Sequence, residues 1–181
     1  SAGVPLDRTN LIWRAAETLW RSLRRSGPIR DIVVQLEKRI PLQAGLGGGS
    51  ADAAAALVAL AHAWRVPLRP SQLTDVAAHI GSDVPFFLTG GTALGLGRGE
   101  IIRPLRDLKI GPVIILMPAL HLSTADVYRR TDAILTRPRG QTRIYRFSPQ
   151  EVRGKQVAGF LTNDLQRAVS ARTSMSVMRP P

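Results

Sequence analysis

Cysteine is absent from the 181-residue chain. Its absence excludes disulfide bonds, thiolate metal sites and cysteine nucleophiles, and it fits a reducing compartment, so we expect a cytoplasmic protein. Aromatic residues make up only 5% of the chain, which argues against a stacking platform for single-stranded nucleic acid. Long apolar runs are also missing: none reaches the roughly 18 residues that a membrane span requires, and the first residues do not predict a signal peptide. We therefore expect no membrane partner.

Acidic residues are scarce, with 13 Asp and Glu against 25 Lys and Arg, which gives a net charge of +12. Such a balance favours a polyanionic partner, which could be a nucleotide, a phosphate, RNA or an acidic membrane. The alternative is a solvated, arginine-rich surface, and the spread of the arginines along the chain favours it. We expect no specific nucleic-acid ligand.

The first long helix is predicted over residues 10–26. Apolar side chains recur there at about helical spacing and should face the core, and Gly27-Pro28 would end the helix. The predicted core residues are Leu11, Ala15, Leu19 and Leu23. Trp13 and Trp20 lie on a neighbouring face, and tryptophans at this spacing are more often core residues than ligand contacts.

A glycine-rich stretch over residues 41–50 is the most informative part of the chain. Residues 30–38 alternate between apolar and polar side chains and predict a half-buried strand before it, and an alanine-rich run over residues 51–64 predicts a helix after it. A strand, a glycine loop and a helix place backbone N–H groups and a helix N-terminus around an anion. Ser50 should cap this helix, and Asp52 should lie in its first turn, where the helix dipole favours an acid. A bare glycine turn followed by a core helix would have the same local composition.

The downstream sequence predicts further helices and strands. Residues 71–80 should form a helix capped by Ser71, residues 89–100 two short strands around a glycine turn, and residues 111–118 a buried strand. Asp83 sits at a turn before an apolar run, so it is either a turn-capping residue or an acid held near a buried surface that can serve as a base. His62, His79 and His121 share no metal-binding spacing, and we predict no metal site in the protein.

The string P-x-x-A-G-L-G-G-G-S-x-D-A-A, from Pro41 onwards, resembles the phosphate-binding motif of the GHMP small-molecule kinases. G-x-D-V-P-F-F, which contains Asp83, resembles the family's G-A-D-V-P motif, with Ser82 in place of alanine. Residues 89–100 and 123–128 resemble two further family elements. Within the family, the chain is most similar to a kinase of non-mevalonate isoprenoid synthesis.

The resemblance implies an α+β fold. Residues 1–118 would form the two-layer GHMP kinase N-terminal domain, which is ribosomal S5 domain 2-like, and residues 119–181 the beginning of the C-terminal α+β domain. Two family elements have no counterpart in the chain: an N-terminal P-A-K-x-N strand with a catalytic lysine, and a second glycine loop of S-G-S-G type. The resemblance therefore implies a fragment or a shortened gene product, as a monomer or a homodimer.

The resemblance also implies a reaction, in which ATP, with Mg²⁺, phosphorylates the 2-hydroxyl of a cytidine-diphosphate-linked methylerythritol. Asp83 would accept or orient the proton of that hydroxyl, and Tyr128 would lie near the cytosine. Two alternatives stay open: another GHMP kinase, acting on homoserine, mevalonate or a sugar, and a basic RNA-binding domain of the same two-layer fold. The residues implied to bind ATP are Pro41, Leu42, Gln43, Ala44, Gly45, Leu46, Gly47, Gly48, Gly49, Ser50 and Ala51.

The charge balance gives a first testable prediction. We expect only weak binding of oligonucleotides, without sequence preference and falling steeply as salt is raised, because the net charge attracts any polyanion. Filter binding at several salt concentrations measures it. A tight, sequence-selective RNA complex would contradict this expectation and favour the RNA-binding alternative.

Overall fold

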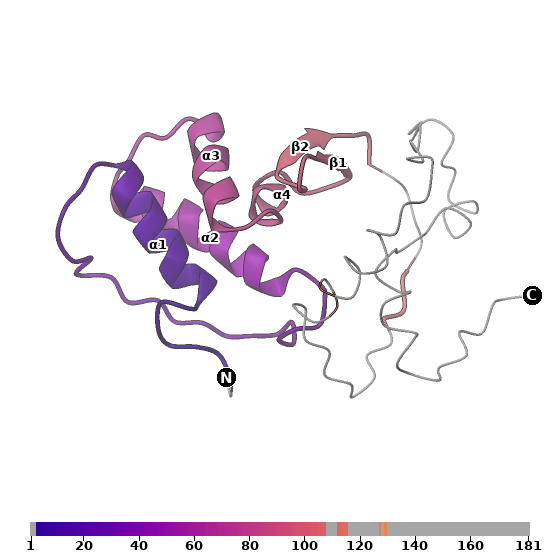
Figure 1. Ribbon diagram of the computed structural model, residues 1–181, viewed down its shortest axis with the longest axis horizontal. Coiled ribbons are helices and arrows are strands. Elements are labelled where there is room, and N and C mark those ends of the chain that lie inside the picture. Colours follow the sequence, from indigo (N-terminus) through magenta and orange to yellow (C-terminus); the bar gives the residue numbers. More distant parts are fainter. Residues whose placement is uncertain (1–2, 108–111, 116–126, 128, 130–181) are drawn as a thin grey trace, which may run out of the picture. The chain divides into compact units, whose positions relative to one another are not determined.

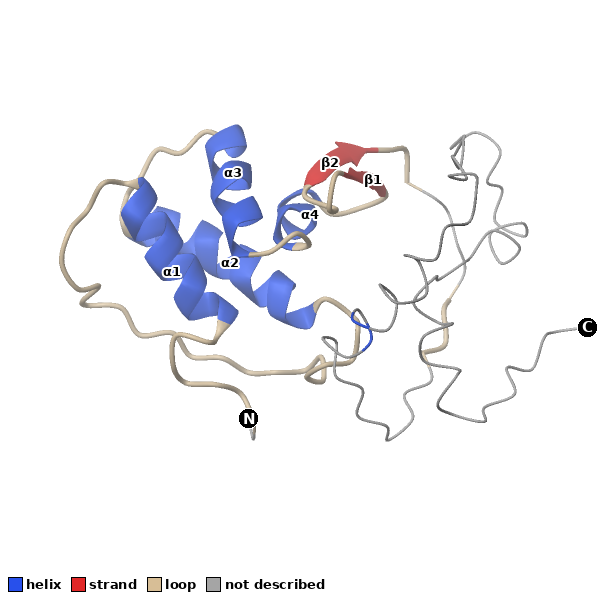
Figure 2. Cartoon of the chain, viewed as in Figure 1, coloured by secondary structure: helices blue, strands red, loops and turns tan. Residues whose placement is uncertain are grey.

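The computed structural model describes residues 3–107, 112–115, 127 and 129. The chain divides into two compact units, Ser1–Asp107 and Leu108–Pro181. The first unit contains, in chain order, α1 (Leu11–Ser22), α2 (Gly48–Ala63), α3 (Pro70–Ile80), α4 (Val84–Thr89), β1 (Ala93–Leu96) and β2 (Ile101–Pro104). Figure 1 shows α1 and α3 packed against α2, and Figure 2 shows the β1–β2 hairpin beside α4. The predicted α+β class is confirmed, and the predicted domain boundary after residue 118 stays a prediction.

Helix α1 begins one residue later than predicted and ends four residues early. The Asn10 side chain caps it by accepting a hydrogen bond of 2.9 Å from the backbone N–H of Ile12. After Ser22 the chain turns out of the helix, with Arg24 at φ +54°. Ala15 and Leu19 are fully buried, as predicted, while Leu11 and Leu23 pack at the edge of the core.

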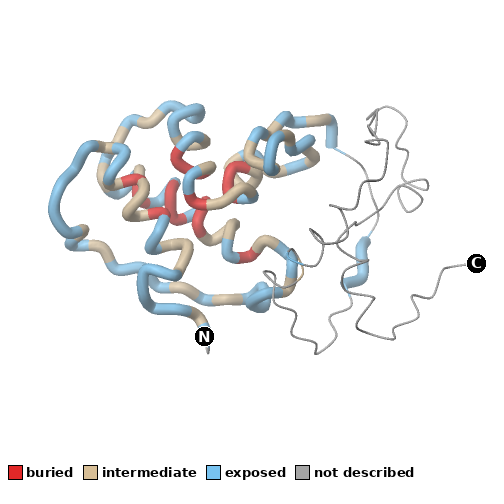
Figure 3. The backbone as a smooth tube through the Cα atoms, in the orientation of Figure 1, coloured by how far each residue is buried: buried red, intermediate tan, exposed pale blue. Residues whose placement is uncertain are grey.

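Helix α2 forms the centre of the core. Its buried face carries small alanines beside larger leucines, which lets α1 approach closely while still filling the space between the helices. Figure 3 shows the buried positions of α1, α2 and α3 facing one another. The buried apolar residues are Ala15, Leu19, Ala53, Ala54, Ala56, Leu57, Leu60, Val76, Ala77, Ile80 and Val84.

Helix α3 begins one residue earlier than predicted, at Pro70, and Ser71 is not its cap. Proline is favoured in the first helical turn because its missing N–H would have no partner there. The Gln72 side chain instead accepts the backbone N–H of Arg69, the residue before the helix, at 3.0 Å. The capping role therefore falls on the third residue of the helix.

A hairpin is present, but its second strand, β2 (Ile101–Pro104), lies beyond the predicted range of residues 89–100. β1 and β2 are antiparallel, with Leu94 opposite Arg103, and Gly97 and Gly99 take positive φ values in the turn between them. Hydrogen bonds from the backbone N–H groups of Glu100 itself and of Arg98, with the nearby Arg98 guanidinium, hold the pKa of the Glu100 carboxyl below its usual value. This carboxylate therefore stabilises the turn as an anion.

The strand predicted over residues 30–38 is wrong. The segment runs without secondary structure, because a strand needs a neighbour to complete its hydrogen-bond ladder and none of the described residues pairs with it. Asp31 also interrupts it with φ +62°. The alternation still predicts part of the burial pattern, since Ile32 and Leu36 are half-buried while Val33 is 96% exposed. Residues 112–115, inside the predicted buried strand 111–118, are likewise exposed and outside any strand.

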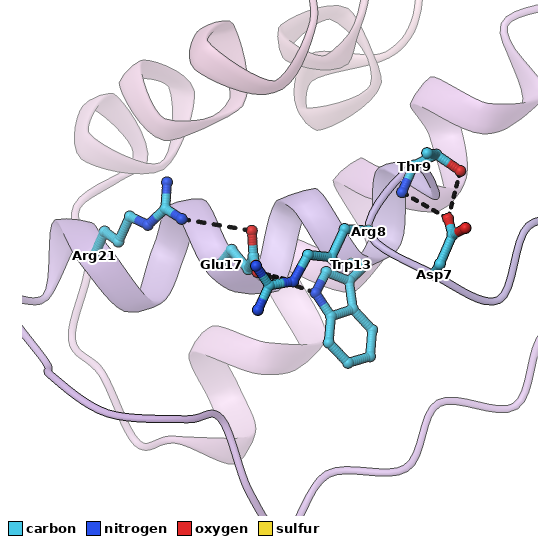
Figure 4. Close-up of polar contacts among 6 residues, drawn as sticks. All are labelled: Asp7, Arg8, Thr9, Trp13, Glu17 and Arg21. Atoms are coloured by element: carbon cyan, nitrogen blue, oxygen red, sulfur yellow. Dashed lines mark hydrogen bonds and ion pairs between the residues drawn. The ribbon is translucent and has the colours of Figure 1, made fainter.

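The tryptophans of α1 differ from the prediction of core residues. Trp13 is 45% exposed, and its indole N–H donates to Glu17 at 3.1 Å. Glu17 also forms ion pairs with Arg8 and Arg21, with nitrogen–oxygen distances of 3.2 and 3.6 Å. Figure 4 shows these contacts. Trp13 therefore belongs to a polar surface network on α1.

Trp20 is half-buried and lies edge-on to Trp64, with ring centroids 5.0 Å apart. The guanidinium of Arg25 lies 5.0 Å from the Trp20 ring centroid. This cation–π contact covers the ring pair where the C-terminal ends of α1 and α2 meet. Among the described residues, no helix is long and apolar enough to cross a membrane.

The central place of α2 predicts a large difference between two neighbouring side chains. Leu57 is fully buried and Val58 is 51% exposed. Leu57→Ala should lower the free energy of unfolding by about 2–5 kcal/mol, because it removes buried surface and leaves a cavity. Val58→Ala, the matched control, should change it by less than about 0.5 kcal/mol. Urea denaturation compares the two, and equal losses would contradict the core described here.

Candidate functional site

The predicted glycine loop leads directly into α2, and Gly47 sets the junction. Gly47 has φ +67° and is the residue before the helix, which begins at Gly48. The prediction that Ser50 caps this helix is wrong, because α2 starts three residues earlier than expected and Ser50 lies inside its first turn. Glycine takes this left-handed conformation at no steric cost, so the turn can end there.

The N-terminus of α2 has no side-chain cap among the described residues. The first backbone N–H to find a helical acceptor is that of Ala51, which donates to the carbonyl of Gly47 at 2.9 Å. The N–H groups before it have no acceptor within the helix, as at any helix start. Together with the helix dipole they favour an anion at this end of α2.

Two glycines at this junction are tightly enclosed. A Cβ at Gly47 would lie 2.6 Å from Cζ of Phe87, and one at Gly48 would lie 2.9 Å from Cγ2 of Ile40. Gly45, by contrast, is positive in φ but has nothing within 4 Å of such a Cβ. The glycines therefore serve two purposes: Gly45 allows the turn, while Gly47 and Gly48 allow close packing.

Asp83 immediately precedes α4 and is exposed. Its carboxylate does not cap the helix, since no side-chain hydrogen bond to the first turn is present. The following Val84 and Pro85 are fully buried and anchor the start of α4. The sequence Asp-Val-Pro therefore fixes the backbone by burying two apolar residues and leaves the acid facing solvent.

Asp83 and the glycine loop meet in one hollow of about 260 Å³. Leu46 and Gly47 come from the loop and Asp83 from the start of α4, so residues predicted from two separate motifs line the same space. The sequence did not assign the other lining residues to the site, although two of them continue the Asp83 motif and three belong to the β1–β2 hairpin. These are Phe86, Phe87, Gly95, Gly99 and Ile102.

Lys38 reaches the start of α2 from the segment before the loop. Its Nζ lies 2.5 Å from Oδ2 of Asp52. Asp52 is the fifth residue of α2, so the prediction that it lies in the first helical turn is wrong: the helix begins earlier, and the carboxylate pairs with Lys38. The local sequence did not predict this contact, because it does not show that the chain folds back over α2.

Two other residues singled out from the sequence, Tyr128 and His121, fall outside the described residues, while the described Val127 is helical. Among the described residues, no group of three or more His, Cys, Asp and Glu side chains could hold a metal ion. The predicted site is thus described for the loop and for Asp83.

Comparison with known proteins gives a consistent result. The model of the GHMP kinases N terminal domain matches residues 10–91. The chain is 43% identical over 173 residues to 4-diphosphocytidyl-2-C-methyl-D-erythritol kinase of Gloeobacter violaceus, a match covering 92% of this chain and 56% of the relative. It is 44% identical over 129 residues to the kinase of the same name from Alkaliphilus metalliredigens, covering 71% and 43%.

A solved structure agrees with the sequence comparison. A crystal structure of 4-(cytidine 5'-diphospho)-2C-methyl-D-erythritol kinase matches with a TM-score of 0.64 and 34% identity, over 92% of this chain and 58% of that one. The chain spans about half the length of the curated relatives it matches.

The packing at the loop predicts unequal effects of two alanine substitutions. Gly45→Ala should cost about 1–2 kcal/mol of unfolding free energy, from left-handed strain alone. Gly47→Ala should cost clearly more, because its new methyl group would also collide with Phe87. Urea denaturation measures both. Adding Phe87→Leu should remove part of the difference, and equal losses in the two single variants would contradict the close approach at Gly47.

Proposed function

Because residues 10–91 match the GHMP kinases N terminal domain, we propose that the chain takes part in phosphorylating the 2-hydroxyl of 4-diphosphocytidyl-2-C-methyl-D-erythritol with ATP. One observation carries the proposal: the glycine loop and Asp83 line a single hollow. A phosphoryl transfer needs an anion site and a group that receives a proton side by side. The names of the relatives supply the identity of the substrate.

In this proposal, residues 41–51 receive the phosphates of ATP. The uncapped N–H groups at the start of α2 would donate to phosphate oxygens, and the dipole of this 16-residue helix would add to the attraction. Gly47 allows the start of α2 to pack against Phe87 at the hollow, because it has no Cβ. The contribution of this part of the protein is to position the reacting phosphate and to stabilise its charge.

Asp83 is the proposed acceptor of the hydroxyl proton. It lines the hollow beside Gly47, and its carboxylate is not used in capping α4. An exposed, uncommitted carboxylate can accept or orient the proton of a hydroxyl group as the oxygen attacks phosphorus. Phe86 and Phe87 provide an apolar wall on the same side, which would limit the access of water.

Mg²⁺ balances phosphate charge in reactions of this kind. It commonly binds through one or two carboxylates together with phosphate oxygens and water. The described residues fit this mode and not a cage built from the protein alone, since Asp83 is the acid that lines the hollow. Asp83 is therefore the residue that would contact such an ion.

The proposal predicts that Asp83→Asn lowers kcat by about 10²–10⁴, the usual contribution of a positioned acid or base. Binding of a non-hydrolysable ATP analogue should change little, because the loop backbone holds the phosphates. Turnover is followed through coupled ADP release with 4-diphosphocytidyl-2-C-methyl-D-erythritol, in an extended chain in which a P-A-K-x-N strand precedes residue 1.

Asp75→Asn is the matched control for this experiment. Asp75 is also an exposed aspartate but lies on α3, beside a different hollow. It should keep the turnover of the parent protein. An Asp83→Asn protein with parental kcat in the extended chain would leave Asp83 without a catalytic role.

A further inference from the structure

We propose that Lys38 and Asp52 form a clamp that holds the glycine loop in its phosphate-binding shape. In this proposal Lys38 is a positioning residue: it acts through the loop and does not touch the nucleotide. The nature of the ligand rests on the proposed function, whereas the clamp itself rests on contacts within the chain.

The pair closes the loop at its base. Lys38 lies before the glycine stretch and Asp52 after it, 14 residues apart in sequence, and Nζ of Lys38 lies 2.5 Å from Oδ2 of Asp52. The residues between them, including Gly45, Gly47 and Gly48, form a segment whose two ends are joined by this ion pair. Glycines make this segment flexible in isolation, so a contact that joins its ends restricts the shapes that it can adopt.

The pair is also the least exposed ion pair among the described residues. The Lys38 side chain is 8% exposed and that of Asp52 27%. In the neighbouring pair, Arg39 and Glu37 are 84% and 77% exposed. Charges shielded from water attract each other more strongly than exposed ones, and an exposed pair contributes little. The electrostatic attraction between Lys38 and Asp52 is therefore stronger than that between Arg39 and Glu37.

The lysine also packs directly on the first residue of α2. A Cβ built on Gly48 would lie 3.1 Å from Nζ of Lys38 and 2.9 Å from Cγ2 of Ile40. The two side chains thus occupy the space beside Gly48 that a Cβ would need, next to Gly47, which lines the hollow. A displacement of Lys38 would be transmitted to the N–H groups that are proposed to bind phosphate.

Charge gives the clamp a second effect. An unpaired Asp52 carboxylate near the start of α2 would repel an anion there, since like charges in a poorly solvated site interact strongly. The ammonium group of Lys38 neutralises the charge of this carboxylate. The low exposure of the ammonium group and its engagement with Asp52 argue against direct contact between Lys38 and a phosphate.

Exchanging the two charges tests the clamp. Lys38→Met should weaken binding of a non-hydrolysable ATP analogue about tenfold or more, which corresponds to about 1.4 kcal/mol. The double variant Lys38→Asp, Asp52→Lys keeps an ion pair in the same place and should recover most of the affinity. Arg39→Met, which breaks the exposed neighbouring pair, should bind like the parent protein. Calorimetric titration in the full chain measures all of these.

A direct phosphate contact by Lys38 would give a different pattern and would overturn the proposal. The exchanged pair would then fail to recover affinity. Parental affinity in Lys38→Met would also overturn it.

Hydrogen exchange separates failure of the clamp from failure of the proposed function. If the parent protein does not bind the ATP analogue, the proposed function fails, but the clamp can still be measured without ligand. Amides of residues 51–53, the first of α2 to have acceptors within the helix, should then exchange about tenfold faster or more in Lys38→Met, while those of residues 54–60 in the core of α2 stay closer to parental rates. The exchanged pair should restore the slow rates; unchanged exchange at residues 51–53 would overturn the clamp.

Discussion

The left-handed backbone of Gly47 is the constraint on which the rest of the site depends. It ends the loop, starts α2 at Gly48 and leaves the helix without a side-chain cap among the described residues. The same glycine meets the ring of Phe87, so close that no side chain fits between them. One position thus joins the loop, the helix and α4, and it brings the start of α2 to the hollow that Asp83 lines.

Helix α2 connects this site to the core. Its middle is buried by α1, α3 and α4, so its N-terminus is presented by an element that cannot move without disturbing the core. Phosphoryl transfer depends chiefly on positioning and charge stabilisation, and a helix fixed in this way suits both. Asp83 is held in a comparable manner, because the buried Val84 and Pro85 that follow it anchor its backbone.

Local patterns in the sequence predicted a good part of this arrangement. The spacing of Leu11, Ala15 and Leu19 identified the buried face of α1, and the glycine-rich turn identified the β1–β2 hairpin, because both depend on residues close in sequence. Features that depend on distant contacts were missed. The alternation of residues 30–38 does not reveal whether a neighbouring strand is present.

The predicted roles of Ser50 and Asp52 failed for a related reason, since the start of α2 is decided by the backbone of Gly47 and not by the nearest capping side chain. The roles of Asp83 and of residues 41–51 came from the family resemblance and stay predictions. The geometry adds that the two motifs face one hollow, which neither motif reveals alone.

The central claim is that this hollow is one nucleotide site shared by the loop and Asp83. Titration of the ¹⁵N-labelled chain with a non-hydrolysable ATP analogue, followed through its backbone amide signals, tests it most directly. The account predicts that the signals of Gly47, Gly48 and Asp83 shift together and saturate with one common Kd, while those of Asp75 stay unchanged. Shifts confined to the polar surface network on α1 around Glu17, with Gly47 and Asp83 unaffected, would contradict it.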